Sequence, residues 1–209
     1  MDDSVRIAPS ARFRRGLPPA GFTLMELMVT IAVAGVLLAA ATPNLRTFLQ
    51  NNRLSSAAND MLRSFQIARS EAIKRQQNVV VCASANPTDA NPTCSYGAFS
   101  GWIVFQDSNF NWSVDAGEPI LERHALLDSS ITVKVDNDGI ESYASTGFAS
   151  PGGVRTPTRN ILLCDMRGNQ VIGVNSVERA VLVADTGRVR VSRVANDVNT
   201  AAGQTGACP

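Results

Sequence analysis

The chain has 209 residues, of which 44% are hydrophobic and 18% are charged, a length and composition that suit one domain with an additional segment. Lys and Arg number 19 and Asp and Glu number 18, so the formal net charge is +1, which excludes a uniformly basic protein that coats nucleic acid. The apolar content excludes a long disordered chain. A single long apolar run in the sequence excludes a multi-pass membrane protein.

That apolar run covers residues 22–41. As a helix with a rise of about 1.5 Å per residue it spans about 30 Å, which is the thickness of the hydrocarbon core of a bilayer. Arg6, Arg12, Arg14 and Arg15 precede it, so the N-terminus should stay in the cytoplasm while the remainder crosses the membrane. A secretory signal peptide is the alternative, but the run exceeds most signal-peptide cores and continues into a helical pattern.

Glu26 is the one charged residue in this run. A carboxylate at that depth costs roughly 2–3 kcal/mol unless it is paired, which favours a functional role over a position near the membrane edge. Residues 21–27, Gly-Phe-Thr-Leu-Met-Glu-Leu, resemble the class III signal of type IV pilins. The resemblance implies that a prepilin peptidase cleaves after Gly21 and that the new N-terminus, Phe22, is methylated. It also implies that Glu26 pairs with the N-terminal amine of a neighbouring subunit in a filament.

Pro43 also matches the pilin pattern, and it should kink or locally loosen the helix. Beyond it, apolar residues recur at steps of three and four, which predicts that one helix runs from Phe22 to about Gln76. The Arg residues of its second half are expected to form a solvated face rather than a nucleic-acid stripe. We therefore divide the chain into a leader (1–21), a transmembrane or filament-core half-helix (22–43), an amphipathic half-helix (44–78) and a globular part (79–209).

The globular part contains short β-branched runs punctuated by Gly, Pro, Asn and Asp, which predict strands. They cover residues 79–81, 102–105, 131–135, 161–163, 171–174, 180–183 and 189–191. The last dozen residues are expected to form an irregular tail. The fold class is therefore α+β, with a long N-terminal helix packed on antiparallel sheet, divided into two small sheets.

Four stretches of the mature chain, residues 69–72, 101–107, 117–121 and 187–190, resemble FimT/FimU-type minor pilins and GspH-type minor pseudopilins. The resemblance implies a pilin-like fold, with major and minor pilins and prepilin peptidase as partners. It also implies an inner-membrane anchor with a periplasmic C-terminal domain before assembly, and then a place in a pilus filament, including its tip. No cofactor is expected. We find no nucleophile–base constellation and expect His124 at a surface or in a loop, so no enzymatic activity is expected.

All four cysteines lie beyond the apolar run, which favours two disulfides formed in the periplasm. Three connectivities are open, of which we favour Cys82–Cys94 and Cys164–Cys208. A zinc site is the alternative, but the sequence has no C-x₂-C pair.

An acidic segment places oxygen-bearing residues at positions 1, 3, 5, 7, 9 and 12 of an EF-hand-like loop, which is a weak indication of calcium binding. These residues are Asp107, Asn109, Asn111, Ser113, Asp115 and Glu118. Trp112 replaces the glycine that such a loop needs at position 6, and a strand precedes the loop. An ordinary polar turn is the favoured interpretation.

A basic strand near the C-terminus is the second candidate site. Gly187 suits a turn, and period-two alternation then places Arg188 and Arg190 on one strand face. Arg193 joins the same basic face if the alternation shifts by one residue near the end of the strand. Arginine pairs well with phosphate, and Gly187-Arg188-Val189-Arg190 resembles the GRxR motif by which FimT-type pilins bind double-stranded DNA without sequence preference. The resemblance implies DNA uptake in natural transformation. The alternatives are a structural or priming minor pilin, and a GspH-type pseudopilin of a type II secretion system.

Overall fold

The computed structural model describes residues 21–95, 101–125, 128–150 and 156–208. The chain divides into two compact units, residues 1–45 and residues 46–209, and the first helix, α1 (Leu24–Arg75), contributes to both. The predicted helix began at Phe22 and ended near Gln76, within two residues of these bounds. Residues 1–20 of the predicted leader lie outside the described residues.

In the first unit, α1 begins immediately after Thr23. The Thr23 hydroxyl oxygen accepts the backbone N–H of Glu26 at 3.1 Å, which is the N-cap contact that satisfies an unpaired amide of the first turn. The apolar side chains that follow are exposed, and α1 is long and apolar enough to cross a membrane by length and composition. The helix continues through Pro43 without ending.

In the second unit, α1 buries one stripe of small and apolar side chains. They recur at steps of three and four, as one face of a helix requires: Leu54, Ala57, Ala58, Met61, Ser64, Phe65, Ala68 and Ala72. The helix ends at Arg75, and the next residue, Gln76, has a positive φ of 55°. The N–H of Gln77 then bonds the carbonyl of Ala72 at 3.3 Å, which closes the last turn.

Two antiparallel sheets pack against this stripe. The four-stranded sheet has the order β3-β2-β1-β5. Its strands are β1 (Asn78–Ser84), β2 (Gly101–Asp107), β3 (Ile120–His124) and β5 (Ile140–Tyr143). The five-stranded sheet has the order β4-β6-β8-β7, with β9 also paired to β8. Its strands are β4 (Thr132–Val135), β6 (Asn160–Cys164), β7 (Val171–Ile172), β8 (Asn175–Val183) and β9 (Val189–Val194). The prediction of a long helix on two small antiparallel sheets is confirmed, although β3 and β5 were not predicted.

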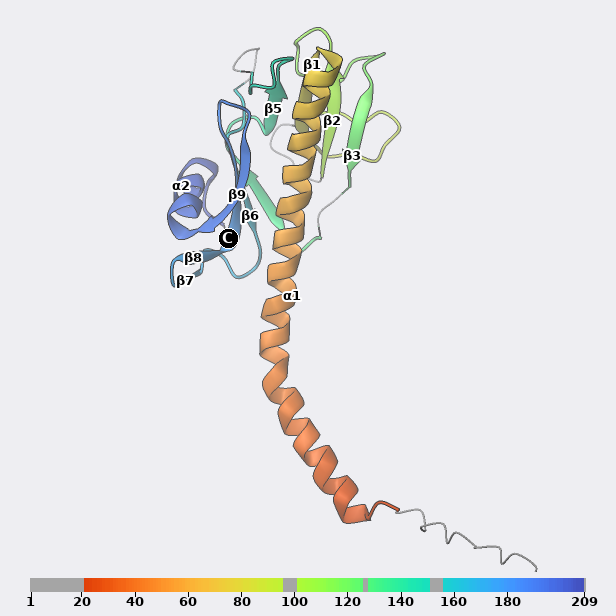
Figure 1. The fold of residues 1–209 in the computed structure, drawn as a ribbon, viewed down its shortest axis with the longest axis vertical. Coiled ribbons are helices and arrows are strands. Elements are labelled where there is room, and N and C mark those ends of the chain that lie inside the picture. The colour runs from red at the N-terminus through yellow and green to blue at the C-terminus, as the bar shows by residue number, and fades with distance from the viewer. Residues whose placement is uncertain (1–20, 96–100, 126–127, 151–155, 209) are drawn as a thin grey trace, which may run out of the picture. The chain divides into compact units, whose positions relative to one another are not determined.

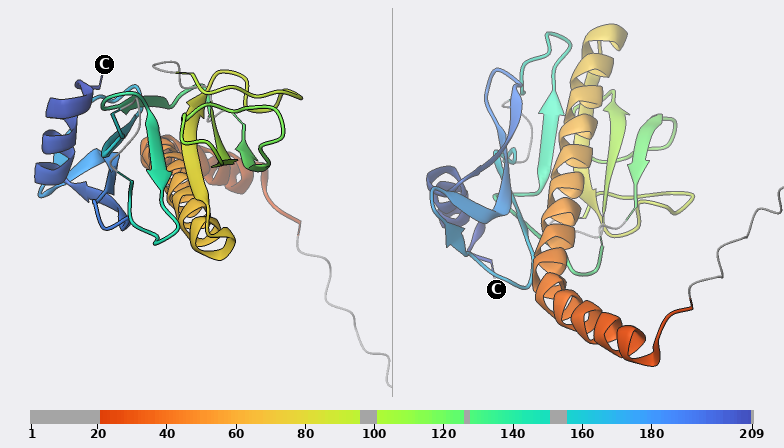
Figure 2. Two further views of the ribbon diagram at one scale, coloured as in Figure 1. Left: turned by 90° about the horizontal axis from the view of Figure 1, so that it is seen from above. Right: turned by 60° about the horizontal axis from the view of Figure 1, so that its bottom comes forward.

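The main core lies where both sheets meet α1. Figure 1 shows β1, β2 and β3 on one side of the helix and β6, β8 and β9 on the other, and the views in Figure 2 agree. Alternate residues of each strand reach this core, for example Val79 and Val81 from β1 and Val181 and Val183 from β8. The intervening residues fill two smaller clusters on the outer faces of the two sheets.

The predicted irregular tail is wrong, because α2 (Ala195–Thr205) follows β9 directly. It covers the outer face of the five-stranded sheet, where Val198 and Ala201 are buried against Leu162, Cys164 and Ala180. The sequence of α2 is rich in Ala, Asn and Thr, which by themselves give only a weak apolar pattern. The helix therefore owes its stability to this packing.

Candidate functional site

The basic strand begins at a tight hairpin turn between β8 and β9. The N–H of Ala184 bonds the carbonyl of Arg188 at 2.9 Å, and the N–H of Gly187 bonds the carbonyl of Ala184 at 2.8 Å. Gly187 has a φ of +77°, and a Cβ added there would lie 2.4 Å from the carbonyl oxygen of Gly147. The turn predicted at Gly187 is therefore present, and its glycine is required by backbone geometry and by close packing.

The strand register separates Arg190 and Arg193 of β9, and Arg188 lies immediately before this strand. Arg190 pairs with Leu182 of β8 and Ser192 with Ala180, and Leu182 and Ala180 belong to the face that α2 covers. Arg188 and Arg190 therefore share this outer face, as predicted. By the same alternation Arg193 lies on the opposite face, where it comes within electrostatic range of Arg179.

The two arginines of the outer face differ in their contacts. Arg188 is exposed, and its side chain forms no hydrogen bond or ion pair with another described residue. Arg190 Nη1 donates to Asp197 Oδ2 of α2 at 2.7 Å, and the Ser192 hydroxyl donates to the same oxygen at 2.6 Å. The hydrogen bond between Arg190 and Asp197 lowers the pKa of Asp197 and raises the pKa of Arg190. Sequence patterning did not indicate the contact with Asp197.

A third arginine, Arg159, joins this surface from the position immediately before β6. A hollow of about 420 Å³ is lined by Arg159, Asn160, Leu182, Val183, Ala184, Arg188 and Arg190. Arg159 is held in place by an ion pair with the fully buried Glu141 and by a 3.3 Å contact with the exposed Asp185. Burial raises the pKa of Glu141, and the Arg159 guanidinium opposes that shift. The hollow thus gathers three guanidinium groups, one from β9 and two from the positions immediately before β6 and β9. This chemistry suits phosphate or carboxylate.

The other arginines near in sequence do not reach this hollow. Arg167 forms an ion pair with Asp165 and donates to Asn51 of α1 at 3.0 Å. Arg179 is buried, and its Nη1 donates to the carbonyls of Val177 and Glu178. Arg155 lies outside the described residues.

The acidic loop folds around its own amides. Asp107 is buried, and its carboxylate accepts the N–H groups of Phe110 and Trp112 at 2.8 and 2.9 Å. Side-chain amides of Asn109 and Asn111 donate to Asp115 Oδ2 at 2.7 and 2.6 Å. The remaining acidic residue behaves similarly: Glu118 accepts the N–H groups of Ser108 and Asp115.

Through these contacts the loop is held together by hydrogen bonds among its own residues. Trp112 has a positive φ of 61° and is fully buried against the outer face of the four-stranded sheet. The backbone bends to insert this indole, whereas the EF-hand pattern requires glycine there to wrap oxygen atoms around a cation. The carboxylates bond to protein donors, and the arrangement fits the ordinary polar turn better than a calcium site.

The structure contains the two disulfides that we favoured. Cys82–Cys94 closes the loop after β1, with Cα atoms 5.6 Å apart, and Cys164–Cys208 joins β6 to the segment after α2, with Cα atoms 5.7 Å apart. Glu178 lies beside the second disulfide and is fully buried, without a hydrogen-bond partner for its carboxylate among the described residues. Burial raises the pKa of this carboxyl group, and the nearby Asp165 adds to the effect.

The pilin-like N-terminal residues stand at the beginning of α1. Gly21 and Phe22 precede the helix, and Phe22 is 84% exposed. Glu26 lies in the first turn and is exposed, and its carboxylate forms no ion pair with another described residue. The structure therefore places Gly21 and Phe22, which flank the predicted cleavage position, in non-helical backbone before α1.

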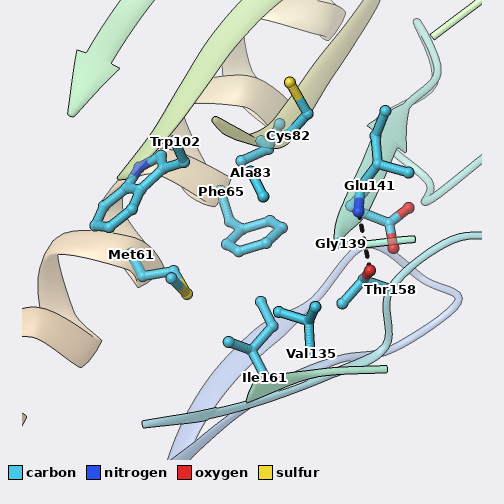
Figure 3. A pocket seen from close by; sticks show the side chains of 12 residues that line it. Met61, Phe65, Cys82, Ala83, Trp102, Val135, Gly139, Glu141, Thr158 and Ile161 are labelled. Carbon is cyan, nitrogen blue, oxygen red and sulfur yellow. Dashed lines mark hydrogen bonds between the residues drawn. The ribbon is translucent and has the colours of Figure 1, made fainter. Parts of the chain in front are cut away.

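The remaining candidates for chemistry are His124 and a small cavity in the core. His124 lies at the end of β3, where its side chain is 29% exposed, as expected for a surface residue, and it stacks on Trp102 with ring centroids 3.9 Å apart. Figure 3 shows the cavity between α1 and the two sheets, with Met61, Phe65 and Trp102 facing Val135 and Ile161. Its volume of about 20 Å³ is enough for one water molecule and too small for a substrate.

Two family models match this chain. The model described as type II transport protein GspH matches residues 57–200, and the prokaryotic N-terminal methylation motif matches residues 19–42. The two matches cover the globular unit and the start of α1 respectively.

Individual proteins are also similar to this chain. The type IV major pilin protein PilE of Neisseria gonorrhoeae is 28% identical over an alignment of 148 residues, and the match covers 57% of this chain and 86% of PilE. The type IV minor pilin FimU of Pseudomonas aeruginosa is 18% identical with a TM-score of 0.43, covering 69% of this chain and 92% of FimU. The minor pseudopilin EpsH of the Vibrio cholerae type II secretion system is 11% identical with a TM-score of 0.45, covering 69% of this chain and 96% of EpsH.

Proposed function

Because the chain belongs to the GspH family of type II transport proteins, which places it among the minor pilins and pseudopilins, we propose that it is a minor pilin that binds DNA during natural transformation. The DNA contacts are Arg188 and Arg190, supported by the turn at Gly187. The observation that carries this proposal is the exposed side chain of Arg188, which forms no hydrogen bond or ion pair with another described residue and lines the same hollow as Arg190. We assign the protein no catalytic role.

The N-terminal residues carry the assembly part of the proposal. The methylation motif covers residues 19–42, and implies processing by prepilin peptidase and association with other pilins. In this proposal cleavage after Gly21 releases a methylated Phe22 amine, and Glu26 of one subunit pairs with that amine in a neighbour. The pairing neutralises a carboxylate that is otherwise costly in an apolar environment. The anchored C-terminal domain faces the periplasm before assembly and is carried to the pilus, including its tip.

Processing is testable by intact-mass spectrometry of the protein from membranes that contain prepilin peptidase. We expect loss of residues 1–21 and addition of one methyl group to Phe22. Gly21→Leu should leave the full-length mass, because the bulky side chain obstructs the cleavage position. Gly35→Leu is the matched control, since Gly35 lies within α1 with open space around it. An unprocessed wild-type chain would contradict the proposal.

DNA binding is testable with the full-length protein in a non-ionic detergent and a short labelled duplex, measured by fluorescence anisotropy over a range of salt concentrations. Affinity should fall as salt rises, because phosphate contacts release counterions. Arg188→Ala with Arg190→Ala should weaken binding by at least about tenfold, since hydrogen bonds to charged groups are strong. The salt slope should become shallower by about 1.8, the value for two lost phosphate contacts.

The control removes two exposed arginines of α1, by Arg46→Ala with Arg63→Ala, and changes net charge equally. This control should retain most of the affinity, because these side chains belong to the solvated helix face. Equal losses in the two double variants would point to a general charge effect. In the source bacterium, the β9 variant should lower transformation and leave piliation normal.

A pseudopilin of a type II secretion system is the second candidate, favoured by the family that matches residues 57–200. In that role the arginines of β9 contact neighbouring subunits instead of DNA. Absence of DNA binding at low salt by the folded, oxidised wild-type protein would favour this candidate.

A further inference from the structure

The contact between Arg190 and Asp197 bears on how this surface accepts a phosphate, and the inference rests on the proposed DNA binding. Arg190 and Ser192 lie on one face of β9 and direct two donors to a single oxygen, Asp197 Oδ2, at 2.7 and 2.6 Å. A guanidinium and a hydroxyl that converge in this way form a site for an oxyanion. In the free protein the oxyanion in this site is the carboxylate of Asp197.

The pair is placed where DNA can compete with it. The Arg190 side chain is 52% exposed and that of Asp197 is 26% exposed. Arg190 also lines the 420 Å³ hollow with Arg159 and Arg188, so a phosphate that enters the hollow meets the same guanidinium. Ion pairs between partly exposed side chains add little to stability, so exchanging one oxyanion for another costs the fold little.

We propose that Asp197 is an intramolecular competitor of the DNA phosphate, which occupies Arg190 in the free protein and gives way when a phosphate backbone enters the hollow. Arg188 makes the first contact, because its side chain forms no hydrogen bond or ion pair with another described residue. Arg159 stays in position because the buried Glu141 holds it, and its contact with the exposed Asp185 is the second one that a phosphate can replace. The surface is thus partly neutralised by its own carboxylates, which lowers the affinity of a single subunit.

The experiment is the duplex-binding titration of the full-length protein, with Asp197→Asn as the variant. Asparagine keeps the oxygen that accepts from Ser192 and removes the charge that competes for Arg190. We expect affinity to rise about fivefold and the salt slope to steepen by about 0.9, which is the value for one added phosphate contact. A variant that only loosens α2 should change the affinity for the duplex in the opposite direction.

Two further variants decide whether the gain acts through Arg190. Asp89→Asn changes net charge equally in the loop that follows β1, where the Asp89 side chain contacts Asn86, and it should leave affinity within about twofold of wild type. Asp197→Asn in an Arg190→Ala background should give no gain, because the guanidinium that it liberates is absent.

The outcomes separate this inference from the proposed function. A gain of similar size in Asp89→Asn, or one that survives in the Arg190→Ala background, would overturn the role of Asp197 while DNA binding stood. An unchanged or weaker affinity in Asp197→Asn would do the same. If neither wild type nor any variant bound the duplex at low salt, the proposed function and this inference would both fail.

Discussion

Gly187→Ala is expected to lower the free energy of unfolding by about 3 kcal/mol. About 1–2 kcal/mol comes from forcing a residue with a Cβ into a positive φ, here +77°. The remainder comes from overpacking, because the new methyl group would lie 2.4 Å from the Gly147 carbonyl oxygen and 3.1 Å from Tyr143. Neither neighbour can yield easily, since one is backbone and the other is a fully buried ring.

Urea unfolding followed by tryptophan fluorescence measures this effect, because both tryptophans lie in the core of the second unit. The matched control is Gly173→Ala. Gly173 has a φ of +66° but open space around it, so this variant should lose only the 1–2 kcal/mol of backbone strain. Equal losses in the two variants would show that the close approach to Gly147 contributes nothing.

This prediction also separates two roles of the GRxR glycine. A Gly187→Ala protein should lose DNA binding under conditions where the variant unfolds. At a temperature where the variant remains folded, its arginines should still bind. Gly187 therefore supports the site by allowing the turn, and the phosphate contacts belong to the arginines.

Removing the disulfide that joins Cys164 and Cys208 by serine substitutions is expected to cost about 4 kcal/mol. The chain-entropy model gives this value for a closed loop of 44 residues. The Cys82–Cys94 disulfide closes a loop of 12 residues, so replacing these two cysteines with serine should cost about 3 kcal/mol. The two variants should differ little in their free energy of unfolding, so the decisive measurement is one of local stability.

Hydrogen exchange of α2 provides that local measurement. Cys208 follows α2, and the disulfide holds the segment after the helix to β6. Loss of this disulfide should increase exchange in residues 195–205, because the helix buries only Val198 and Ala201 fully. Loss of the Cys82–Cys94 disulfide should leave α2 protected. Unchanged protection of α2 in both variants would show that packing alone holds the helix.

The Cys164–Cys208 disulfide thus connects stability to the candidate site. Asp197 lies in the first turn of α2 and contacts Arg190, so the position of α2 sets the distance between the two charges. A protein without the Cys164–Cys208 disulfide should therefore hold Asp197 less firmly over the arginine.

Features that depend on neighbouring residues were predictable from the sequence. The apolar run predicted that α1 begins at Phe22, two residues before its observed start, and the strands follow from β-branched segments bounded by turn residues. The shared face of Arg188 and Arg190 follows from the two-residue period of a strand. The positions of β6, β8 and β9 were predicted in the same way, since each strand carries its own apolar pattern.

Features that join distant residues were decided by the tertiary structure. The local pattern of α2 is weak, because the surface that stabilises it belongs to β6 and β8. The pairing of Arg190 with Asp197 depends on the helix beginning directly after β9, and Arg159 reaches the same hollow only because β6 lies beside β8. Sequence spacing indicates which side chains share a face of one element, but their charge partners depend on how the elements pack.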